Sequence, residues 1–462
     1  MRDNSSINFL LYCSISFPIF FALFVFITGN VNYPQATIES YKYIEIAKYW
    51  IDNNSTTWGY ESVVQRLPLY PAFIYIIFKI FGFNNLTALI FAQAILGSLT
   101  IFMTIKILEF LKLSKNFIAI CSVIFNFHIF YRFSVFLPNA FFLFFLTTFI
   151  YFFSKFFFEK KIRYFLLLSA VVSLLMLTRP VFQLSILTVI PFLIFMIFRE
   201  INIKYAVKIS LSVLLIFSYF LGLLLQTVRN YNEYDKFSYT IQTGGHLLYV
   251  VTALSITEKS ACGDMDSEMM VKMQREVENK RLNLNSGISD DPVVLNRIKT
   301  AVAKDFLINE VEIGEIIPSL FCAYFKTFFH PSPSAIYQAF GLSLDGFSIT
   351  EGNNFFEKSK NFFLNSFKNV QNLFWLLCFF FLCLMRFFQL CGMINGLFFA
   401  KNNLFYWFLF LTFLTVIIPI IGMSSLRFRT EVETILIIFG ALGIKSLLEK
   451  FKLFPFKNIK LI

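Results

Sequence analysis

The polar stretch at residues 29–71 carries the side chains best suited to chemistry in an otherwise apolar chain. Carboxylates and cations gather there, among them Glu39 and Arg66. Glu39, Tyr43 and Ala47 are spaced at i, i+4 and i+8, so they share one face of a predicted helix. Because a long apolar run precedes this helix, we expect the Glu39 carboxylate at the boundary between water and lipid. A carboxylate in that place suits chemistry on a substrate that has a lipid tail.

Arginines stand at the ends of apolar runs that lie far apart in the sequence. The residues concerned are Arg179, Arg229 beside Asn230, and Arg427 with Arg429, followed one turn later by Glu433. The apolar run before Arg179 offers about 22 Å of helix, so we expect this guanidinium slightly below the outer membrane boundary. Clustered arginines favour phosphate by geometry and charge. Taken singly, such arginines are more often interface anchors than ligands, and Arg179 can also be interpreted as a snorkelling cap of its turn.

The elements that must position these side chains are membrane-spanning helices. Of the 462 residues, 57% are hydrophobic and 19% aromatic, and the mean hydropathy is +0.68. These values exclude an ordinary soluble domain. The net charge of +12 does not indicate nucleic-acid binding, because basic residues gather at the ends of apolar runs, where they set topology. We therefore predict an all-α polytopic membrane protein.

Ten apolar runs have the length and composition of membrane spans. They are residues 7–28, 86–108, 117–134, 136–156, 164–178, 181–198, 206–228, 373–395, 403–424 and 432–448. The run at 68–83 offers only about 20 Å of helix against ~30 Å of hydrocarbon. If it lies flat on the outer face, the basic loops fall on the cytoplasmic side. This arrangement predicts ten spans, cytoplasmic termini, and residues 7–28 as a retained anchor.

Changes in composition divide the chain into three parts. Residues 1–228 are predicted to form an N-terminal transmembrane module whose first outer loop covers residues 29–85. Residues 229–372 are polar enough to lie in water on the outer face, and residues 373–462 form the last spans and a basic cytoplasmic tail. Within the outer segment we expect a mixed structure, strand- or turn-like at 232–257 and helical at 267–280 and 293–329.

The cysteines, the histidines and Arg386 carry weaker signals. Cys378, Cys383 and Cys391 share one apolar run and are interpreted as packing thiols, whereas Cys262 and Cys322 both lie in the outer segment and could pair. Either His246 or His330 could contact a substrate, but the dispersed histidines form no metal pair. Arg386 is expected in the inner half of its span, in a structural role. No glycine loop for nucleotide phosphates and no serine-nucleophile motif is present.

The motifs of this chain resemble those of the polyprenyl-phosphate-dependent glycosyltransferases of the GT-C fold, bacterial relatives of protein O-mannosyltransferases and aminoarabinose transferases. The matching segments, in order along the chain, are Glu39-Ser40 with Tyr43 and Ala47; Arg66 with Pro68, Tyr70 and Pro71; Leu177-Thr178-Arg179-Pro180; Arg229-Asn230-Tyr231 with Thr240 to Tyr249; and Arg427-Phe428-Arg429 with Glu433. The resemblance implies a bundle of about ten transmembrane helices with outer-face juxtamembrane helices.

The sequence departs from the family pattern at several of these positions. Glu39 stands where the family usually has Asp, and its extra methylene moves a catalytic oxygen by about 1 Å, a shift that can be costly. Asn139 stands where many relatives carry an acid at the start of a span. Glu431 stands in place of a usual proline, and His246 in place of an asparagine.

The resemblance implies an enzyme that moves a sugar from a polyprenyl-phosphate donor to an acceptor lipid, protein or glycan. The reaction would take place on the outer face of a bacterial cytoplasmic membrane, towards the periplasm or exterior. Glu39 would be the general base in an inverting displacement, and arginines would stabilise the departing lipid phosphate. The implied substrate-binding residues are Tyr43, Arg66, Arg179, Arg229, Asn230, His246, Arg427, Arg429 and Glu433. The donor is a substrate, no cofactor is implied, and a divalent metal is left open without a site.

Two other classes of function stay open at this point. A transporter or flippase of lipid-linked saccharides would share the polar sites in a membrane bundle, although such proteins tend to have repeated halves with sites near the midplane. In this chain, charges gather at one face. A non-catalytic membrane protein of the GT-C type is the second alternative, suggested by Glu39 and Asn139.

Overall fold

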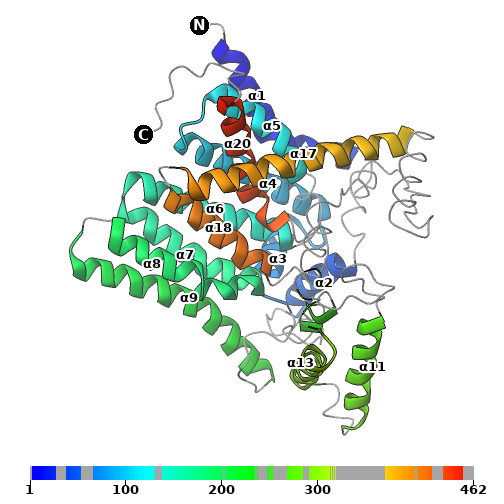
Figure 1. Ribbon diagram of the computed structural model, residues 1–462. Coiled ribbons are helices and arrows are strands. Elements are labelled where there is room, and N and C mark those ends of the chain that lie inside the picture. Colours follow the sequence, from blue (N-terminus) through cyan, green and yellow to red (C-terminus); the bar gives the residue numbers. More distant parts are fainter. Residues whose placement is uncertain are drawn as a thin grey trace.

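A computed structural model describes most of the chain, and all structural statements below refer to the residues that it describes. These are residues 3–27, 38–53, 66–130, 138–200, 203–234, 237, 247–248, 250–252, 268–284, 291–312, 314, 316, 318, 370–400, 403–418 and 430–450. All regular structure in this part of the chain is helical (Figure 1). The all-α fold predicted from composition is therefore confirmed.

The N-terminal half of the described chain is a bundle of apolar helices (Figure 1). Its elements are α1 (Asp3–Ile27), α2 (Ile38–Asp52), α3 (Leu69–Phe81), α4 (Leu86–Phe110), α5 (Lys115–Phe130), α6 (Pro138–Glu159), α7 (Ile162–Thr178), the 3-10 helix η4 (Pro180–Ile186), α8 (Val189–Glu200) and α9 (Tyr205–Tyr234). The C-terminal part adds α17 (Val370–Phe398), α18 (Asn403–Ile417), the 3-10 helix η6 (Thr430–Val432) and α20 (Glu433–Lys450). Each predicted apolar run falls on one of these helices or on the pair η4 and α8.

Four described helices are long and apolar enough to cross a membrane by themselves, and η4 with α8, bent by 42°, makes up to five. Shorter apolar helices accompany them, namely α3, α7, residues 383–398 of α17, and α18. The chain is thus a multi-pass membrane protein, while the count of ten spans stays a prediction.

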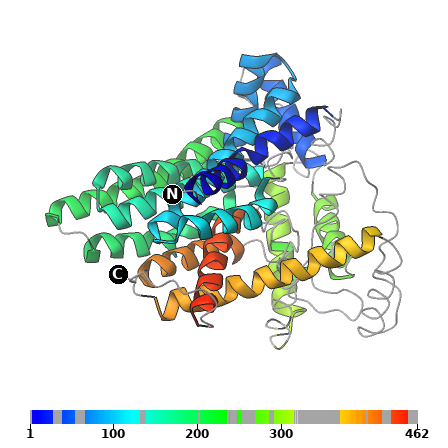
Figure 2. The ribbon, with the colours of Figure 1, turned by 90° about the horizontal axis from the view of Figure 1, so that it is seen from above.

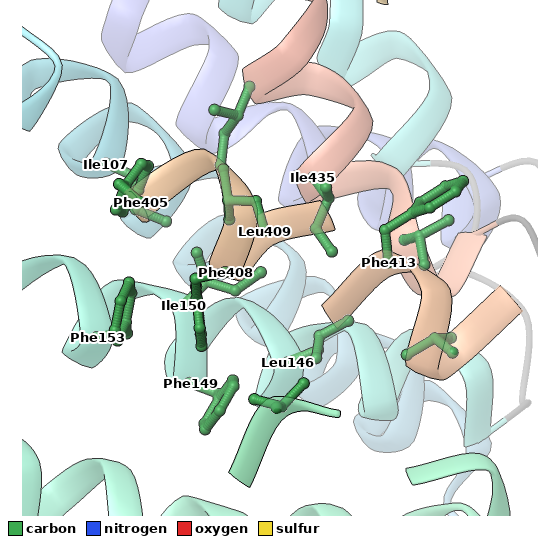
Figure 3. Close-up of a cluster of buried hydrophobic side chains, with 14 of the residues drawn as sticks. Ile107, Leu146, Phe149, Ile150, Phe153, Phe405, Phe408, Leu409, Phe413 and Ile435 are labelled. Atoms are coloured by element: carbon green, nitrogen blue, oxygen red, sulfur yellow. The ribbon is translucent and has the colours of Figure 1, made fainter. Parts of the chain in front are cut away.

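The core is an aromatic seam between α6 and α18 (Figure 3). The rings of Phe153 and Phe408 stack with centroids 3.5 Å apart, and Phe149 packs at 5.5 Å from Phe408. Phe405 completes the seam, and like Phe149 and Phe153 it has no exposed surface. Buried aromatic rings of this size contribute strongly to core packing. The seam joins the N-terminal bundle to the C-terminal helices, which therefore form one packed unit.

Two glycines set the crossing of α17 and α20, the most intimate helix contact in the described chain. A Cβ atom at Gly392 would lie 1.7 Å from the main-chain oxygen of Phe439, and one at Gly443 would lie 1.8 Å from that of Phe388. Small residues let membrane helices approach until their backbones touch. Helix α17 crosses α20 obliquely rather than running parallel to it (Figures 1 and 2).

The described part of the outer segment is helical. Helices α11 (Glu268–Leu282) and α13 (Pro292–Asn309) pack side by side around Met273 and Val302, and Val251 joins them from a helical piece at 250–252. Asp291 caps α13 by accepting hydrogen bonds from the main-chain nitrogens of Val293 (2.8 Å) and Val294 (3.4 Å). Where we expected strand- or turn-like structure, the described residues 247–248 and 250–252 are helical because their apolar side chains pack on α11.

Candidate functional site

The ends of several helices bring polar side chains together at one end of the bundle. The chain leaves α7 at Arg179, whose backbone is extended (φ −146°, ψ 134°) and whose main-chain nitrogen still donates to the oxygen of Leu175 at 3.2 Å. Pro180 cannot continue an α-helix, and it restricts the preceding residue to an extended conformation. The Arg-Pro pair therefore ends α7 and turns the guanidinium towards the starts of α6 and α20.

A first cluster joins α2, the chain before α3 and the end of α9. The guanidinium of Arg66 lies over the ring of Tyr43, with its central carbon 4.5 Å from the ring centroid. Nη1 of Arg229 donates to the main-chain oxygen of Arg66 at 3.3 Å and to Oε1 of Gln226 at 3.0 Å. Asn230 is buried and accepts from Gln226 at 3.2 Å. This cluster contains four of the residues predicted from sequence: Tyr43, Arg66, Arg229 and Asn230.

Tyrosine and phenylalanine rings connect this cluster with the start of α6. Tyr43 packs edge-on to Tyr70 at 5.2 Å, and the hydroxyl of Tyr70 donates to Oε1 of Gln93 at 2.6 Å. The ring of Tyr70 also lies 5.6 Å from that of Phe141, in the first turn of α6. Both Tyr43 and Tyr70 are buried. The aromatic contacts hold α2 and α3 against the helix whose first turn contains Asn139.

A second cluster surrounds Glu431, which has no exposed surface. Nη2 of Arg179 lies 3.0 Å from Oε1 of Glu431, and Nδ2 of Asn139 donates to the same oxygen at 2.6 Å. The side chain of Arg179 is only 12% exposed. The network thus joins the end of α7, the first turn of α6 and the 3-10 turn η6. We had noted Asn139 and Glu431 only as departures from a family pattern, and sequence reasoning missed that they meet.

Glu433 pairs with an arginine of another helix. Its Oε1 is 3.4 Å from Nη2 of Arg386 on α17, and both side chains are almost fully buried. Arg386 also donates to Oε1 of Gln389 one turn on. This ion pair places Arg386 beside the start of α20, while its predicted position in the inner half of its span stays a prediction. Helix α17, which contains Arg386, crosses the bundle obliquely (Figure 2).

Some predicted site residues cannot be placed relative to these clusters. Glu39 belongs to the first turn of α2, one turn before Tyr43, but its side chain is outside the described part of the structure. His246, Arg427 and Arg429 lie outside the described residues, as do Cys262 and Cys322. The predicted meeting of Glu39 with Arg179 therefore stays a prediction. Within the described residues, no group of three or more His, Cys, Asp or Glu side chains is arranged to hold a metal ion.

Comparisons with known proteins agree with the motifs. Residues 65–224 match the family described as dolichyl-phosphate-mannose-protein mannosyltransferase, a segment that includes Arg66, Asn139 and Arg179. The structure is similar to the apo oligosaccharyltransferase of Archaeoglobus fulgidus, with a TM-score of 0.53 and 12% identity over 98% of this chain and 51% of the archaeal chain. The chain thus spans about half the length of that protein. No curated protein matches its sequence.

A second solved structure, ArnT from Cupriavidus metallidurans bound to undecaprenyl phosphate, aligns with a TM-score of 0.33 and 10% identity over 90% of this chain and 75% of that one. The fold is assigned from the similarity to the archaeal protein, which extends over nearly the whole chain. The mannosyltransferase family matches a shorter segment, from just before α3 into α9. The chain is therefore a multi-pass membrane protein with the GT-C fold.

Proposed function

We propose that the protein is an integral-membrane glycosyltransferase that moves a sugar from a polyprenyl-phosphate donor to an acceptor hydroxyl on the outer face of the membrane. The observation that carries this proposal is the stacking of Arg66 on Tyr43, one turn from Glu39 on α2, with Arg229 hydrogen-bonded to the main-chain oxygen of Arg66. The proposal places the sugar at the polar end of the bundle and the lipid tail against its apolar helices.

Arg66 is the best candidate among the described residues for the donor phosphate. None of the described carboxylates pairs with its guanidinium, and its Nε is buried without a hydrogen-bond partner among the described groups. A bound anion would strongly stabilise a half-buried guanidinium that has no carboxylate partner. The planar guanidinium of arginine also matches the geometry of phosphate oxygens. Arg229 is held beside it through the main chain at position 66. Together they provide positive charge from two distant segments.

The chemistry is a single displacement at the anomeric carbon. The acceptor oxygen forms a bond to that carbon while the bond from the carbon to the phosphate oxygen breaks. Glu39 accepts the proton from the acceptor hydroxyl as general base. The electron pair of the broken bond leaves with the polyprenyl phosphate, and the arginines stabilise the charge that grows there. Because one displacement occurs, the configuration at the anomeric carbon inverts.

The test is a transfer assay with purified protein in lipid nanodiscs, a set of polyprenyl-phosphate sugars as donors, and lipid, peptide and glycan acceptors. We expect free polyprenyl phosphate to appear together with glycosylated acceptor, both detected by mass spectrometry. Replacement Glu39→Gln should lower the rate by at least about 100-fold, since general bases contribute factors of this order. The matched control is Glu45→Gln, an exposed carboxylate on the same helix, which should keep the wild-type rate. Unchanged turnover by the Glu39→Gln protein would remove Glu39 from the mechanism.

One observation favours a second candidate, a flippase of lipid-linked saccharides. Helices η4 and α8 form a span that is bent by 42°, and broken helices are common in transporters. Proteoliposomes that contain a labelled lipid-linked sugar distinguish the two functions. Movement of the label between leaflets with no release of polyprenyl phosphate would favour the flippase. A protein that does neither would be a non-catalytic member of the fold.

A further inference from the structure

Two cations share one tyrosine ring where α6 turns into α7. Nζ of Lys155 lies 4.9 Å from the centroid of the Tyr164 ring, and the central guanidinium carbon of Arg163 lies 4.8 Å from the same centroid. Nη2 of Arg163 also donates to the hydroxyl of Tyr164 at 2.8 Å. Because Tyr164 is buried, its ring is a fixed platform for both cations. We call Lys155 and Arg163 the cation pair.

Neither member of the cation pair forms an ion pair with a carboxylate among the described residues. Glu159, the acidic residue of this turn, attracts Lys155 electrostatically, but its ion pair is with Lys161 at 2.9 Å. Two like charges held around one ring repel each other, and a bound anion relieves that repulsion. A topology signal requires only that basic residues lie in the loop, so it does not explain why two of them are stacked on one buried ring.

The neighbouring turn adds positive charge at the same end of the bundle. Nζ of Lys160 lies 3.6 Å from Oε2 of Glu200, and this ion pair joins the α6–α7 turn to the end of α8 (Figure 1). Residues 155–163 and 199–208 together contain seven Lys and Arg against two Glu, a net charge of +5. The surface around the cation pair therefore attracts anions.

Exposed apolar side chains continue from the cation pair along α7. Leu166 and Leu167 are 47% and 45% exposed and follow Arg163 by three and four residues, so they lie one turn farther along the same face of the helix. An anion with acyl chains can place its phosphate at the cation pair and its chains along these leucines. An inorganic anion or an acidic soluble protein would leave the leucines uncovered.

This surface lies at the opposite end of α7 from the candidate functional site. Helix α7 has 17 residues, which span about 25 Å at 1.5 Å per residue. Arg163 lies in its first turn, and Arg179 follows directly after its last residue. A lipid bound at Arg163 is therefore distinct from a sugar donor bound near Arg179.

We propose that the cation pair binds the headgroup phosphate of an anionic glycerophospholipid whose acyl chains lie along Leu166 and Leu167. In the predicted topology this lipid belongs to the cytoplasmic leaflet, where basic pockets between membrane helices bind anionic headgroups. Sugar transfer is not involved, because no covalent bond of this lipid changes.

The experiment measures lipid binding to the delipidated full-length protein by native mass spectrometry. Phosphatidylglycerol and phosphatidylcholine with identical acyl chains are titrated separately, and wild type should bind phosphatidylglycerol at least about tenfold more tightly. The variant K155Q/R163Q should lose this preference, because both cations are removed. The swap K155R/R163K keeps both charges and should bind phosphatidylglycerol within about threefold of wild type.

The matched control is K112Q/K115Q, which removes two exposed lysines from the turn between α4 and α5. It changes the net charge by the same amount and should keep the wild-type preference. Thermal unfolding in detergent, without added lipid, shows which variants are folded. Should K155Q/R163Q not fold, the single variants K155Q and R163Q supply the same test, each with a loss of at least about threefold.

Several outcomes would overturn the proposed site. Equal binding of the two lipids by wild type would do so, as would a folded K155Q/R163Q protein that keeps the preference. An equal loss in K112Q/K115Q would mean that any basic turn serves. Displacement of phosphatidylglycerol by inorganic phosphate would identify a site for soluble anions, and displacement by less than one equivalent of polyprenyl phosphate would identify a second donor site. None of these readouts depends on whether the protein transfers a sugar, so failure of the proposed function would leave this site standing.

Discussion

Among single residues, Arg66 has the contacts that best indicate what kind of ligand the site binds. Its guanidinium stacks on Tyr43, and its main-chain oxygen accepts a hydrogen bond from Arg229. A substitution of the side chain therefore removes the stacked cation and leaves the main-chain contact with Arg229 in place. Arg66 is consequently a clean position at which to test the anion site.

We expect Arg66→Gln to weaken binding of polyprenyl phosphate by at least about tenfold, because a charge-assisted pair is lost. Arg66→Lys should recover only part of this loss, since lysine keeps the charge but loses the planar fork and the stacking on Tyr43. Native mass spectrometry of the lipid complex measures both effects. Lys79→Gln is the control, since Lys79 lies 5.7 Å from the ring of Tyr75 but is exposed. Equal affinity in the Gln, Lys and wild-type proteins would exclude Arg66 from the phosphate site.

Local motifs singled out residues that the structure brings together, but they did not identify all of the partners of these residues. Tyr43, Arg66 and Arg229 were predicted from local motifs, and the structure brings them together. The bond between Asn139 and Glu431 joins residues 292 positions apart, and nothing local marks such a pair. A buried polar residue at the start of an apolar run, as Asn139 is, was the only available signal. Glu433 was selected because it follows the arginine motif, whereas Glu431, two residues earlier, contacts Arg179.

At the scale of elements, apolar runs located the helices to within a few residues. They did not show breaks, because composition does not change at them. The run 181–198 is one stretch by hydropathy but divides into η4 and α8. Pro191 explains where the second helix restarts, since proline is tolerated in the first turn, where its missing N–H costs nothing. The oblique path of α17 was likewise invisible in a one-dimensional pattern.

The crossing of α17 and α20 gives an element-scale prediction. Gly392→Ala should lower stability by about 1–3 kcal/mol or more, because the added methyl group would overlap the main-chain oxygen of Phe439 and force the helices apart. Thermal unfolding in detergent measures the effect. Gly443→Ala should behave similarly from the other helix. Gly314→Ala is the matched control, since no atom of the described residues outside its own helix and chain neighbours lies within 4 Å of a Cβ placed there. A wild-type unfolding temperature for Gly392→Ala would mean that the helices are farther apart than described.

At the scale of the whole molecule, topology follows from how α3 is arranged. Its 13 residues are too few to cross about 30 Å of hydrocarbon. Its buried face, which includes Tyr70, Ile74 and Phe78, packs into the bundle, while Ile76 and Ile80 are exposed. A short helix with an exposed apolar side is suited to contact with lipid at the membrane surface.

Cysteine labelling tests this topology in intact cells that express a variant without native cysteines. Asn53→Cys lies before α3 and Phe83→Cys lies after it, and both positions are exposed. Each cysteine should react with a membrane-impermeant maleimide added outside the cells. Lys161→Cys, at the exposed turn between α6 and α7, should react only after permeabilisation. Labelling of just one of the first two positions would mean that α3 spans the membrane and that the predicted orientation of the later helices is reversed.

The fold class was accessible from sequence because it depends on composition. The way in which the last helices close onto the first ones was not, because it depends on contacts between distant segments. The aromatic seam of Phe153 and Phe408 and the ion pair of Arg179 and Glu431 both bridge the two halves. Single-sequence periodicity contains no information on such pairs.

The bond from Arg229 to the main chain of Arg66 bears on whether the protein can be divided. It links residues 163 positions apart across the composition boundary at residue 228. A polypeptide that ends at residue 228 would therefore lack the arginine that steadies the chain before α3, as well as the glutamate that neutralises Arg179. Neither fragment would hold a complete site, and two co-expressed fragments would regain one only by reassembling. Recombination between homologous genes at this boundary should accordingly give inactive hybrids unless both contacts are inherited together.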